Sequence, residues 1–470
     1  MNQRIGFFIV AAIVLLSNIV ACADDSDSMG PLRIHPDNPR YFSDGNGHTI
    51  WLTGSHTWAN LCERGIEGET PDFDYAGYLD FLEGHGHNFI RLWAWEQAQW
   101  MQFVPKEVPV RYSPLPYQRT GPGTALDGKP KFDLTKFNEE YFTRLRTRVE
   151  QARERGIYVG VMLFQGFSLD KRGGKTQMGN AWQGHPFNKA NNVNGIDGNP
   201  SGDDSGHEVH ELKVAEITKL QEAYVRKVID TLGDMDNVLW EIGNECHGGS
   251  VQWQYHMIRF IKQYESEKGL KPHLVGMTGA PISAEALFAS PADWISPPKG
   301  IWLNDPPVNE GKKIVIVDTD HCDPWHHDPE WVWKALFRGH HFILMDGYMD
   351  YRLGSPEKSD PLWDETREAM GDALWFSDEI DLAGLEPDTK TASSGYCLKG
   401  ADRIVVYAPK GETVDVDLKM FAGAIDAIWF DIESGEMRSD TTVANGLRHK
   451  FTSPYPGRSI LFVTAKEYEE

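Results

Sequence analysis

Apolar positions along the chain follow two different patterns, one up to about residue 380 and another beyond it. From about residue 36, short runs of β-branched and aromatic residues alternate with longer segments whose apolar positions recur every three or four residues. Such alternation is typical of repeated βα units around a parallel sheet. The strands predicted in this way are His48–Gly54, Asn88–Trp93, Ile157–Phe164, Asn237–Ile242, His273–Met277, Trp294–Ser296, Lys313–Val317 and His341–Met345.

Helical periodicity is clearest between these strands. The predicted helices are Leu134–Arg155, Glu208–Leu232, Val251–Lys268, Trp331–Arg338 and Leu362–Phe376. Eight strands with interposed helices predict an α/β fold, a (β/α)8 TIM barrel over residues 36–380 with its catalytic groups at the C-terminal strand ends. A doubly wound open sheet is the alternative.

Beyond residue 380 the pattern changes to short alternating strands broken by turns, which predicts a small β-sandwich over 381–470. The strands expected there are Gly395–Leu398, Arg403–Ala408, Thr413–Leu418, Ala424–Phe430 and Ser459–Thr464. Within the barrel, Gln97–Lys131 and Gly166–Gly206 are long segments rich in Gly, Pro and Asn. Loops of that length are usually functional, so we expect them to build the walls of a cleft.

The N-terminus has the pattern of an export signal. A short basic region precedes a nearly continuous apolar run over residues 6–19, which is too short to span a bilayer. The run ends at Ala21-Cys22 and resembles a bacterial lipoprotein signal, in which the cysteine becomes the lipidated N-terminus. We expect residues 1–21 to be removed, residues 22–35 to form an acidic tether, and the mature protein to be a periplasmic or cell-surface lipoprotein. Ordinary secretion after cleavage near the same point is the alternative.

Composition narrows the range of partners. Hydrophobic residues make up 40% and charged residues 24% of the 470 positions, which is typical of a globular protein. The 46 basic and 69 acidic residues give a formal charge of −23, which disfavours nucleic acid and leaves the N-terminal lipid as the expected contact with a membrane. Sixteen tryptophans are a large share, and both core packing and stacking on sugars use this residue. The sequence does not indicate an oligomeric state.

The segment Asn237-Val-Leu-Trp-Glu-Ile-Gly-Asn-Glu245 carries the strongest chemical signal. An apolar strand runs directly into Asn244 and Glu245, so in a barrel the Glu245 carboxyl group lies at the C-terminal mouth. A carboxyl group in such a cleft can have its pKa raised by desolvation and act as a general acid toward a leaving oxygen. A solvated pair of loop residues that caps the next helix is the alternative.

A second carboxylate is needed if the reaction is glycoside hydrolysis. The candidates are Asp318 and Asp320 in Lys313-Ile-Val-Ile-Val-Asp-Thr-Asp-His321, where a spacing of two places both on the same side of a strand. We favour Asp320 as the nucleophile, because it lies nearer the rim and is followed by His321, and we expect Asp318 to bind substrate or support the site. A helix cap in a structural loop is the alternative.

Further polar and aromatic residues fall near the ends of predicted strands or in the long loops. The expected substrate-binding residues are His56, Trp58, Arg91, Trp93, Trp95, Glu96, Gln165, His185, Asn192, Asn244, Asp346 and Tyr348. Arg91 could keep a carboxylate ionised, and the tryptophans could stack on sugar C–H faces. Each aromatic could equally belong to the core, and turn chemistry explains the asparagines of the third loop equally well.

Other kinds of site have weaker support. The histidines of His207-Glu208-Val209-His210 are three apart, whereas a zinc metalloprotease helix needs them four apart. His321, His326 and His327 could bind a metal but lack a third spaced ligand. We therefore expect neither a metal nor another cofactor.

Several motifs together resemble known glycosidases. The segment Trp240–Glu245, with Arg91 after the second strand and a carboxylate after the seventh, resembles the retaining clan A of glycoside hydrolases. The segments that more narrowly resemble the apiosidase-like group, glycoside hydrolase family 140 and its relatives, are Leu52–Trp58, Glu150–Val159, His185–Asn188, Asn191–Gly195 and Gln221–Val228. Trp429–Glu436 resembles the C-terminal module of that group, which is often labelled a collagen-binding domain of a collagenase.

This resemblance implies Glu245 as acid/base, Asn244 as the partner of the sugar hydroxyl beside the reacting carbon, and Arg91 as the supporting cation. The chain departs from clan A at the seventh strand, where it offers an aspartate in place of the usual glutamate, so an inverting route is an alternative to retention. We expect a glycoside hydrolase acting on a plant or algal polysaccharide side chain, with an apiosyl linkage in pectin as the leading candidate. A clan A glycosidase for another linkage and an inactive carbohydrate-binding lipoprotein are the alternatives.

Overall fold

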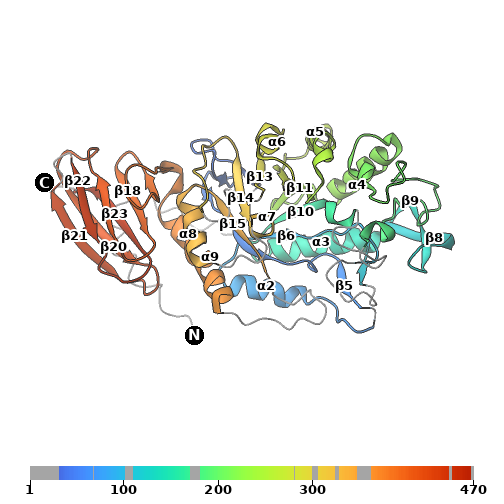
Figure 1. Cartoon of the computed structure of the whole chain (residues 1–470), viewed down its shortest axis with the longest axis horizontal. Helices are drawn as coiled ribbons and strands as arrows, with labels where there is room; N and C mark the ends of the chain where they lie inside the picture. Colours follow the sequence, from blue (N-terminus) through green and yellow to red (C-terminus); the bar gives the residue numbers. More distant parts are fainter. Residues whose placement is uncertain are drawn as a thin grey trace. The chain divides into compact units, whose positions relative to one another are not determined.

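The computed structural model describes residues 31–66, 68–100, 110–169, 180–279, 281–298, 305–322, 328–346, 361–443 and 447–466. They form two compact units, one up to Pro387 and one from Asp388 onward, and each is described by itself (Figure 1). The expected lipidation site Cys22, with the signal segment around it, and the expected ligand Tyr348 lie outside the described residues.

The first unit is a parallel (β/α)8 barrel, as the hydrophobic pattern predicted. Around the barrel the strands are β4 (Thr53–His56), β15 (His341–Met345), β14 (Ile314–Asp318), β13 (Trp294–Ser296), β12 (Val275–Thr278), β11 (Val238–Asn244), β10 (Tyr158–Gln165) and β6 (Phe89–Leu92). All of their residues are buried, as in other parallel sheets covered on both faces. The barrel nearly closes between β4 and β6, where the backbone N–H of Asn88 donates to the carbonyl of Thr53 at 3.1 Å.

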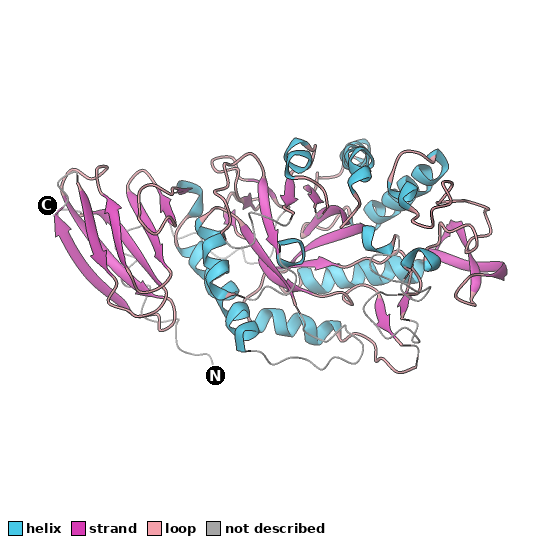
Figure 2. Ribbon diagram, viewed as in Figure 1, coloured by secondary structure: helices cyan, strands magenta, loops and turns pink. Residues whose placement is uncertain are grey.

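Helices lie between the strands and around the barrel (Figure 2). The α-helices are α2 (Tyr75–Gly84), α3 (Glu139–Arg153), α4 (Ala215–Leu232), α5 (Val251–Lys268), α6 (Ala284–Ala289), α7 (Thr319–Cys322), α8 (Pro329–Phe337) and α9 (Pro361–Glu379). The 3-10 turns are η1 (Gly166–Ser168), η3 (Ala181–Gly184), η4 (His207–His210), η5 (Gly248–Ser250) and η6 (Leu382–Gly384). Among the residues that the structure describes, none of the helices has the length and apolarity needed to cross a membrane.

Three predicted boundaries were wrong for local reasons. The first barrel strand begins at Thr53 and not at His48, because β3 (Thr49–Ile50) pairs instead with β2 (Phe42–Ser43), which also pairs with β1 (Arg33–Ile34). Helix α3 begins at Glu139 and not at Leu134, because the preceding residues form a strand and Asn138 caps the helix. The segment predicted as a helix from Glu208 is first the turn η4, and α4 follows it.

The two long insertions fold together beside the barrel. A hairpin of β8 (Tyr117–Thr124) and β9 (Pro130–Phe137) contacts the third loop, where Phe132 N donates to Asn191 O at 2.8 Å. The insertions share an apolar cluster of Ala98, Leu115, Tyr117, Phe132, Leu134, Leu169, Trp182, Phe187, Ile196, Val209 and Ile217. Two short strands, β5 (Glu63–Gly65) and β7 (Arg111–Ser113), form a separate antiparallel pair.

The second unit is antiparallel and has its own apolar core. Its larger sheet has the order β17 (Cys397–Lys399), β18 (Arg403–Ala408), β23 (Ser459–Ala465), β20 (Ala424–Asp431) and β21 (Met437–Val443). A smaller sheet pairs β19 (Thr413–Asp417) with β22 (Arg448–Thr452), and residues of both sheets pack into one core around Trp429. The short strand β16 (Glu386–Pro387) ends the first unit. The two strands that the sequence pattern missed, β21 and β22, are mostly polar.

Candidate active site

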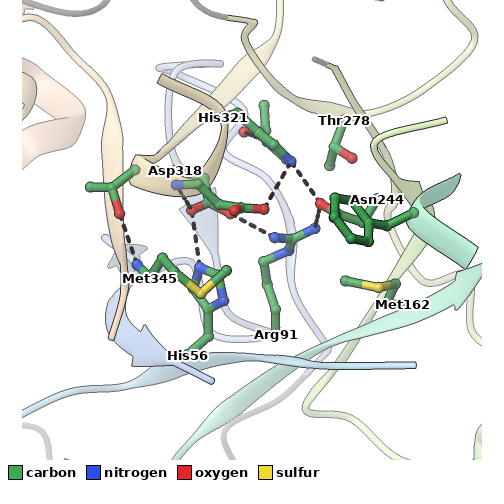
Figure 3. A network of polar contacts seen from close by, with 12 residues as sticks. His56, Arg91, Met162, Asn244, Thr278, Asp318, His321 and Met345 are labelled. Atoms are coloured by element: carbon green, nitrogen blue, oxygen red, sulfur yellow. Dashed lines mark hydrogen bonds and ion pairs between the residues drawn. The ribbon is translucent and has the colours of Figure 1, made fainter. Parts of the chain in front are cut away.

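Arg91 is the centre of a buried polar network inside the C-terminal end of the barrel (Figure 3). Its Nε and Nη2 donate to the Glu241 carboxylate, the first at 2.9 Å, and its Nη1 donates to Asp318 Oδ2 at 2.7 Å. Nη2 also donates to Asn244 Oδ1 at 2.9 Å. Burial alone would lower the pKa of Arg91, but Glu241 and Asp318 outweigh it and raise that pKa. Strands β6, β11 and β14 are therefore joined at the mouth by one guanidinium group.

Asp318, the last residue of β14, is completely enclosed in this network. Its Oδ1 accepts hydrogen bonds from His56 Nε2 at 3.0 Å and from the backbone N–H of Asp320 at 2.9 Å. Burial alone would raise the pKa of Asp318, but His56 and Arg91 hold that pKa below its usual range. Asp318 is therefore ionised. Because it accepts from Asp320 N at the start of a short helix, it also acts in part as a helix cap, which was its alternative interpretation.

Asp320 is also buried, but it differs from Asp318 in its secondary structure, its hydrogen bonds and the direction of its pKa shift. It lies in helix α7, so the expectation that alternation along a strand would align the two aspartates was wrong. The residue is 7% exposed, and its Oδ2 has no hydrogen-bond partner among the described residues, although His321 Nε2 lies 3.8 Å from that oxygen. Burial, together with the charges of Glu245 and Asp318, raises the pKa of Asp320 well above its usual value. The surroundings of Asp320 therefore favour its protonated form, and Glu245 is one of the charges that do so.

Asn244 and Glu245 continue directly from β11. Asn244 Oδ1 accepts from His321 Nε2 at 2.7 Å as well as from Arg91, and its Nδ2 donates to Gln165 Oε1 at 3.3 Å. Glu245 is half-buried and has a φ of 46°, a left-handed conformation that is uncommon for a residue other than glycine. Strained backbone of this kind concentrates at functional sites.

Two members of the network were missing from the expected site. Glu241 lies within β11, and its signal in the sequence was a charged residue in an otherwise apolar strand, which needs a buried partner. His321 was considered as support for Asp320 and as a metal ligand. In the structure its ring is buried between Asn244 and Ser296, whose Oγ lies 3.0 Å from His321 Nδ1.

The tryptophans expected at the mouth pack on one another and on the network. Trp93 stacks on His56 with the ring centroids 5.4 Å apart, and the Arg91 guanidinium lies 4.9 Å from the Trp93 ring. Trp58 contacts both Trp93 and Trp95. Their stacking on a sugar stays a prediction, and Trp58, at 8%, has the largest exposed fraction of the three.

Glu96, Gln165 and His185 are brought together, with His210 as an additional partner. The Glu96 carboxylate accepts from Gln165 N at 2.7 Å, from His210 Nε2 at 2.9 Å and from His185 Nε2 at 3.2 Å. The other ring nitrogen of His185 accepts from Phe187 N at 3.0 Å. Both nitrogens of His185 are therefore used within the protein.

Asn192 and Asp346 have structural roles instead of the substrate-binding roles expected. The Asn192 side chain donates to three backbone carbonyl groups and accepts from Ile196 N at 3.0 Å, all within its own loop. The buried Asp346 carboxylate accepts from Arg367 Nε at 2.9 Å and from Arg367 Nη2 at 2.6 Å, which ties β15 to α9. Their polar groups satisfy the protein's own backbone and charges.

Replacing Asn192 with aspartate tests this structural role. The variant keeps the acceptor for Ile196 N but sets a negative charge against three carbonyl oxygens, so we expect the free energy of unfolding to fall by about 1–3 kcal/mol. Urea unfolding of the variant checks this, with the exposed Asn46→Asp as the control that should change little. A stable Asn192→Asp variant would contradict the structural assignment.

Metal ligands do not gather at this mouth in the part of the chain that the structure describes. No group of three His, Cys, Asp or Glu side chains is placed to hold an ion within the described ranges. His326 and His327, considered above as metal ligands, lie outside those ranges.

Comparison with known proteins places the fold among glycoside hydrolases. Residues 101–291 match a family described as "Domain of unknown function (DUF6298)", and residues 386–460 match "Putative collagen-binding domain of a collagenase". No curated protein matches the chain. A glycoside hydrolase family 5 structure from Bacteroides vulgatus is 15% identical with a TM-score of 0.59, covering 94% of this chain and 95% of that one. A structure from the same organism, described as a "putative glycoside hydrolase", is 13% identical with a TM-score of 0.61, covering 94% of this chain and 83% of that one. At these identities the similarity establishes the fold.

Proposed function

We propose that the protein is a glycoside hydrolase in which Glu245 and Asp320 form the reacting pair of carboxyl groups. The observation that carries this proposal is the placement of two carboxyl groups at the barrel mouth, Glu245 directly after β11 and Asp320 in α7 directly after β14. The charge of Glu245 also contributes, after burial, to raising the pKa of Asp320. Two-carboxylate glycosidases need one protonated and one ionised carboxyl group on opposite sides of the scissile bond. The glycosidase fold and the position of the pair at the C-terminal strand ends support the same conclusion.

The roles follow from the surroundings of each group. The pair shares one proton, which passes from Asp320 to Glu245 when substrate binds. Glu245 then donates that proton to the leaving oxygen while the ionised Asp320 attacks the reacting carbon. Water then hydrolyses the glycosyl–Asp320 ester with Glu245 as base, which completes a retaining reaction. Asn244, whose oxygen is fixed by Arg91 and His321, presents its amide to the hydroxyl beside the reacting carbon. Asp318 keeps Arg91 and His56 in place.

The substrate class that we propose is a side chain of a plant or algal polysaccharide, with an apiosyl linkage in pectin as the first candidate. This part rests on the resemblance of the motifs to apiosidase-like enzymes. The protein is further proposed to be exported and anchored through Cys22. A Cys22→Ser variant expressed in a bacterial host should then lose labelling by radioactive palmitate, whereas ordinary secretion would leave both forms unlabelled.

Screening against defined glycans tests the function. The mature protein is incubated with pectic and algal oligosaccharides, and we expect release of a sugar from at least one of them. NMR of the first product distinguishes retention from inversion, because retention requires that the released anomer match the substrate. Binding without release by any member of the panel would instead establish a carbohydrate-binding protein.

A further inference from the structure

The carboxylate of Glu96 is a junction between three loops at the barrel mouth. Its Oε1 accepts from His210 Nε2 in η4 and from the backbone N–H of Gln165 at the end of β10. Its Oε2 accepts from His185 Nε2, and its own backbone N–H donates to Ser168 Oγ at 3.0 Å. A carboxylate with these partners has little capacity left for a substrate, although its sequence position suggested that role.

Gln165 and Gly166 connect this junction to Glu245. Gln165 is the register partner of Asn244 in the β10–β11 pair, and its Oε1 accepts from Asn244 Nδ2 at 3.3 Å. Gly166 lies directly against the next peptide, because a Cβ atom added to it would come 2.3 Å from the Glu245 carbonyl oxygen. Glu96 therefore fixes the backbone against which the Glu245 peptide rests.

His210 contacts the same segment from the other side. Its ring stacks on Trp253 with centroids 4.5 Å apart, and the Cys246 thiol lies close enough to influence its charge. Burial alone would lower the pKa of His210, but Glu96 and Cys246 raise it to about 10, so the ring is an imidazolium at neutral pH. The Glu96 pKa falls below its usual range, because His210 and His185 outweigh the effect of burial. The pair is thus a buried anion and cation.

We propose that Glu96 and His210 are positioning residues that hold Glu245 in its left-handed conformation. This inference rests on the proposed function of Glu245. A φ of 46° persists only where the surroundings determine it, and here Gly166 lies against the peptide between Glu245 and Cys246. The motif His207-Glu208-Val209-His210 has the wrong spacing for zinc, and in this proposal its last histidine positions Glu245. Its first histidine takes part as well, because His207 O lies 3.1 Å from His247 Nε2.

Kinetics of a Glu96→Gln variant test the proposal. A displaced proton donor should lower kcat by about 10- to 100-fold on a substrate whose leaving group needs protonation, with KM changed less than about twofold. On a 2,4-dinitrophenyl glycoside of the same sugar, whose leaving group departs without a proton, the loss should shrink to a few fold. Gly166→Ala disturbs the same contact without removing a charge and should give the same dependence on the leaving group.

The matched control is Glu63→Gln, because Glu63 also joins loops through Arg144, Arg148 and the backbone N–H of Phe73. We expect it to affect both leaving groups equally. Equal losses on both substrates in Glu96→Gln, or a raised KM with normal kcat, would overturn the proposal and make Glu96 a structural or substrate-binding group.

A readout without substrate separates this proposal from the proposed function. The His210 ring should titrate near pH 10 by NMR in the wild type and at least two pH units lower in Glu96→Gln. Among the described residues, the other titratable groups that interact with this pair include Cys246, His185 and the buried Tyr117, Tyr141 and Tyr224. A crystal structure of the variant should show Glu245 in another backbone conformation. An unchanged Glu245 backbone in the variant would overturn the positioning role, whether or not the wild type hydrolyses a glycoside. A wild type that hydrolyses no glycoside would refute only the proposed function.

Discussion

Replacing Glu245 with glutamine is expected to lower kcat by about 10²- to 10⁴-fold on a glycan whose leaving group is a sugar hydroxyl. The amide keeps the shape of the side chain but cannot donate and recover a proton at neutral pH. The pH–rate profile should lose its alkaline limb, which reports loss of the proton from the general acid. Loss of the Glu245 charge also removes one of the groups that raise the pKa of Asp320, so that pKa should fall and the acidic limb should move to lower pH. Steady-state rates between pH 4 and 9 check both effects.

A control separates lost chemistry from lost structure. Glu222→Gln changes a carboxylate on α4 that pairs with His256 and Arg226, away from the network of Arg91, and should keep wild-type kcat. Glu245→Gln should also retain wild-type thermal stability. Turnover that survives unchanged in Glu245→Gln would remove Glu245 from the reaction and leave Asp320 to act with another group.

The eight barrel strands were predictable because parallel strands covered on both faces form continuous apolar runs. Strands β21 and β22 were missed because a sequence such as Met437–Val443 has neither such a run nor clear alternation. The positions of Asn244, Glu245 and Arg91 were predictable because they lie at or near the ends of apolar strands, while their roles in a reaction stay predictions. Their positions at the mouth follow from the fold class alone.

Which polar side chains bind one another could not be predicted in the same way. Glu96 and His210 are 114 positions apart, and their pairing depends on how two loops fold over the barrel. Asp318 and Asp320 have similar sequence surroundings, yet the strand ends between them, so one is saturated with hydrogen bonds and the other is not. Asn192 and Asp346 are polar and near the right strands, but the fold of its own loop decides what Asn192 binds and helix α9 decides what Asp346 binds.

Replacing Arg91 with methionine is expected to lower the free energy of unfolding by about 3–5 kcal/mol at pH 7, because Glu241 and Asp318 would stay buried without their cation. The difference in free energy of unfolding between the wild type and Arg91→Met should depend on pH. In the wild type the pKa of Asp318 is below its unfolded value of about 4, so its stabilising contribution is present above that pH and is lost as the pH falls. The two proteins should therefore differ more at pH 7 than at about pH 3, below the unfolded pKa of Asp318, as measured by urea unfolding.

Arg153→Met is the matched control, because Arg153 makes a comparable two-bonded pair with Asp236 on the surface and should contribute less than about 1 kcal/mol. Arg91→Lys keeps the charge but loses the planar fork that reaches three partners, so it should lie between the two. If Arg91→Met were as stable as Arg153→Met, the buried network would fix the positions of the side chains at the mouth without adding to the free energy of unfolding. The same variant should then still lose turnover, because Asn244 Oδ1 would keep only His321 of its two partners and the amide would be less firmly fixed.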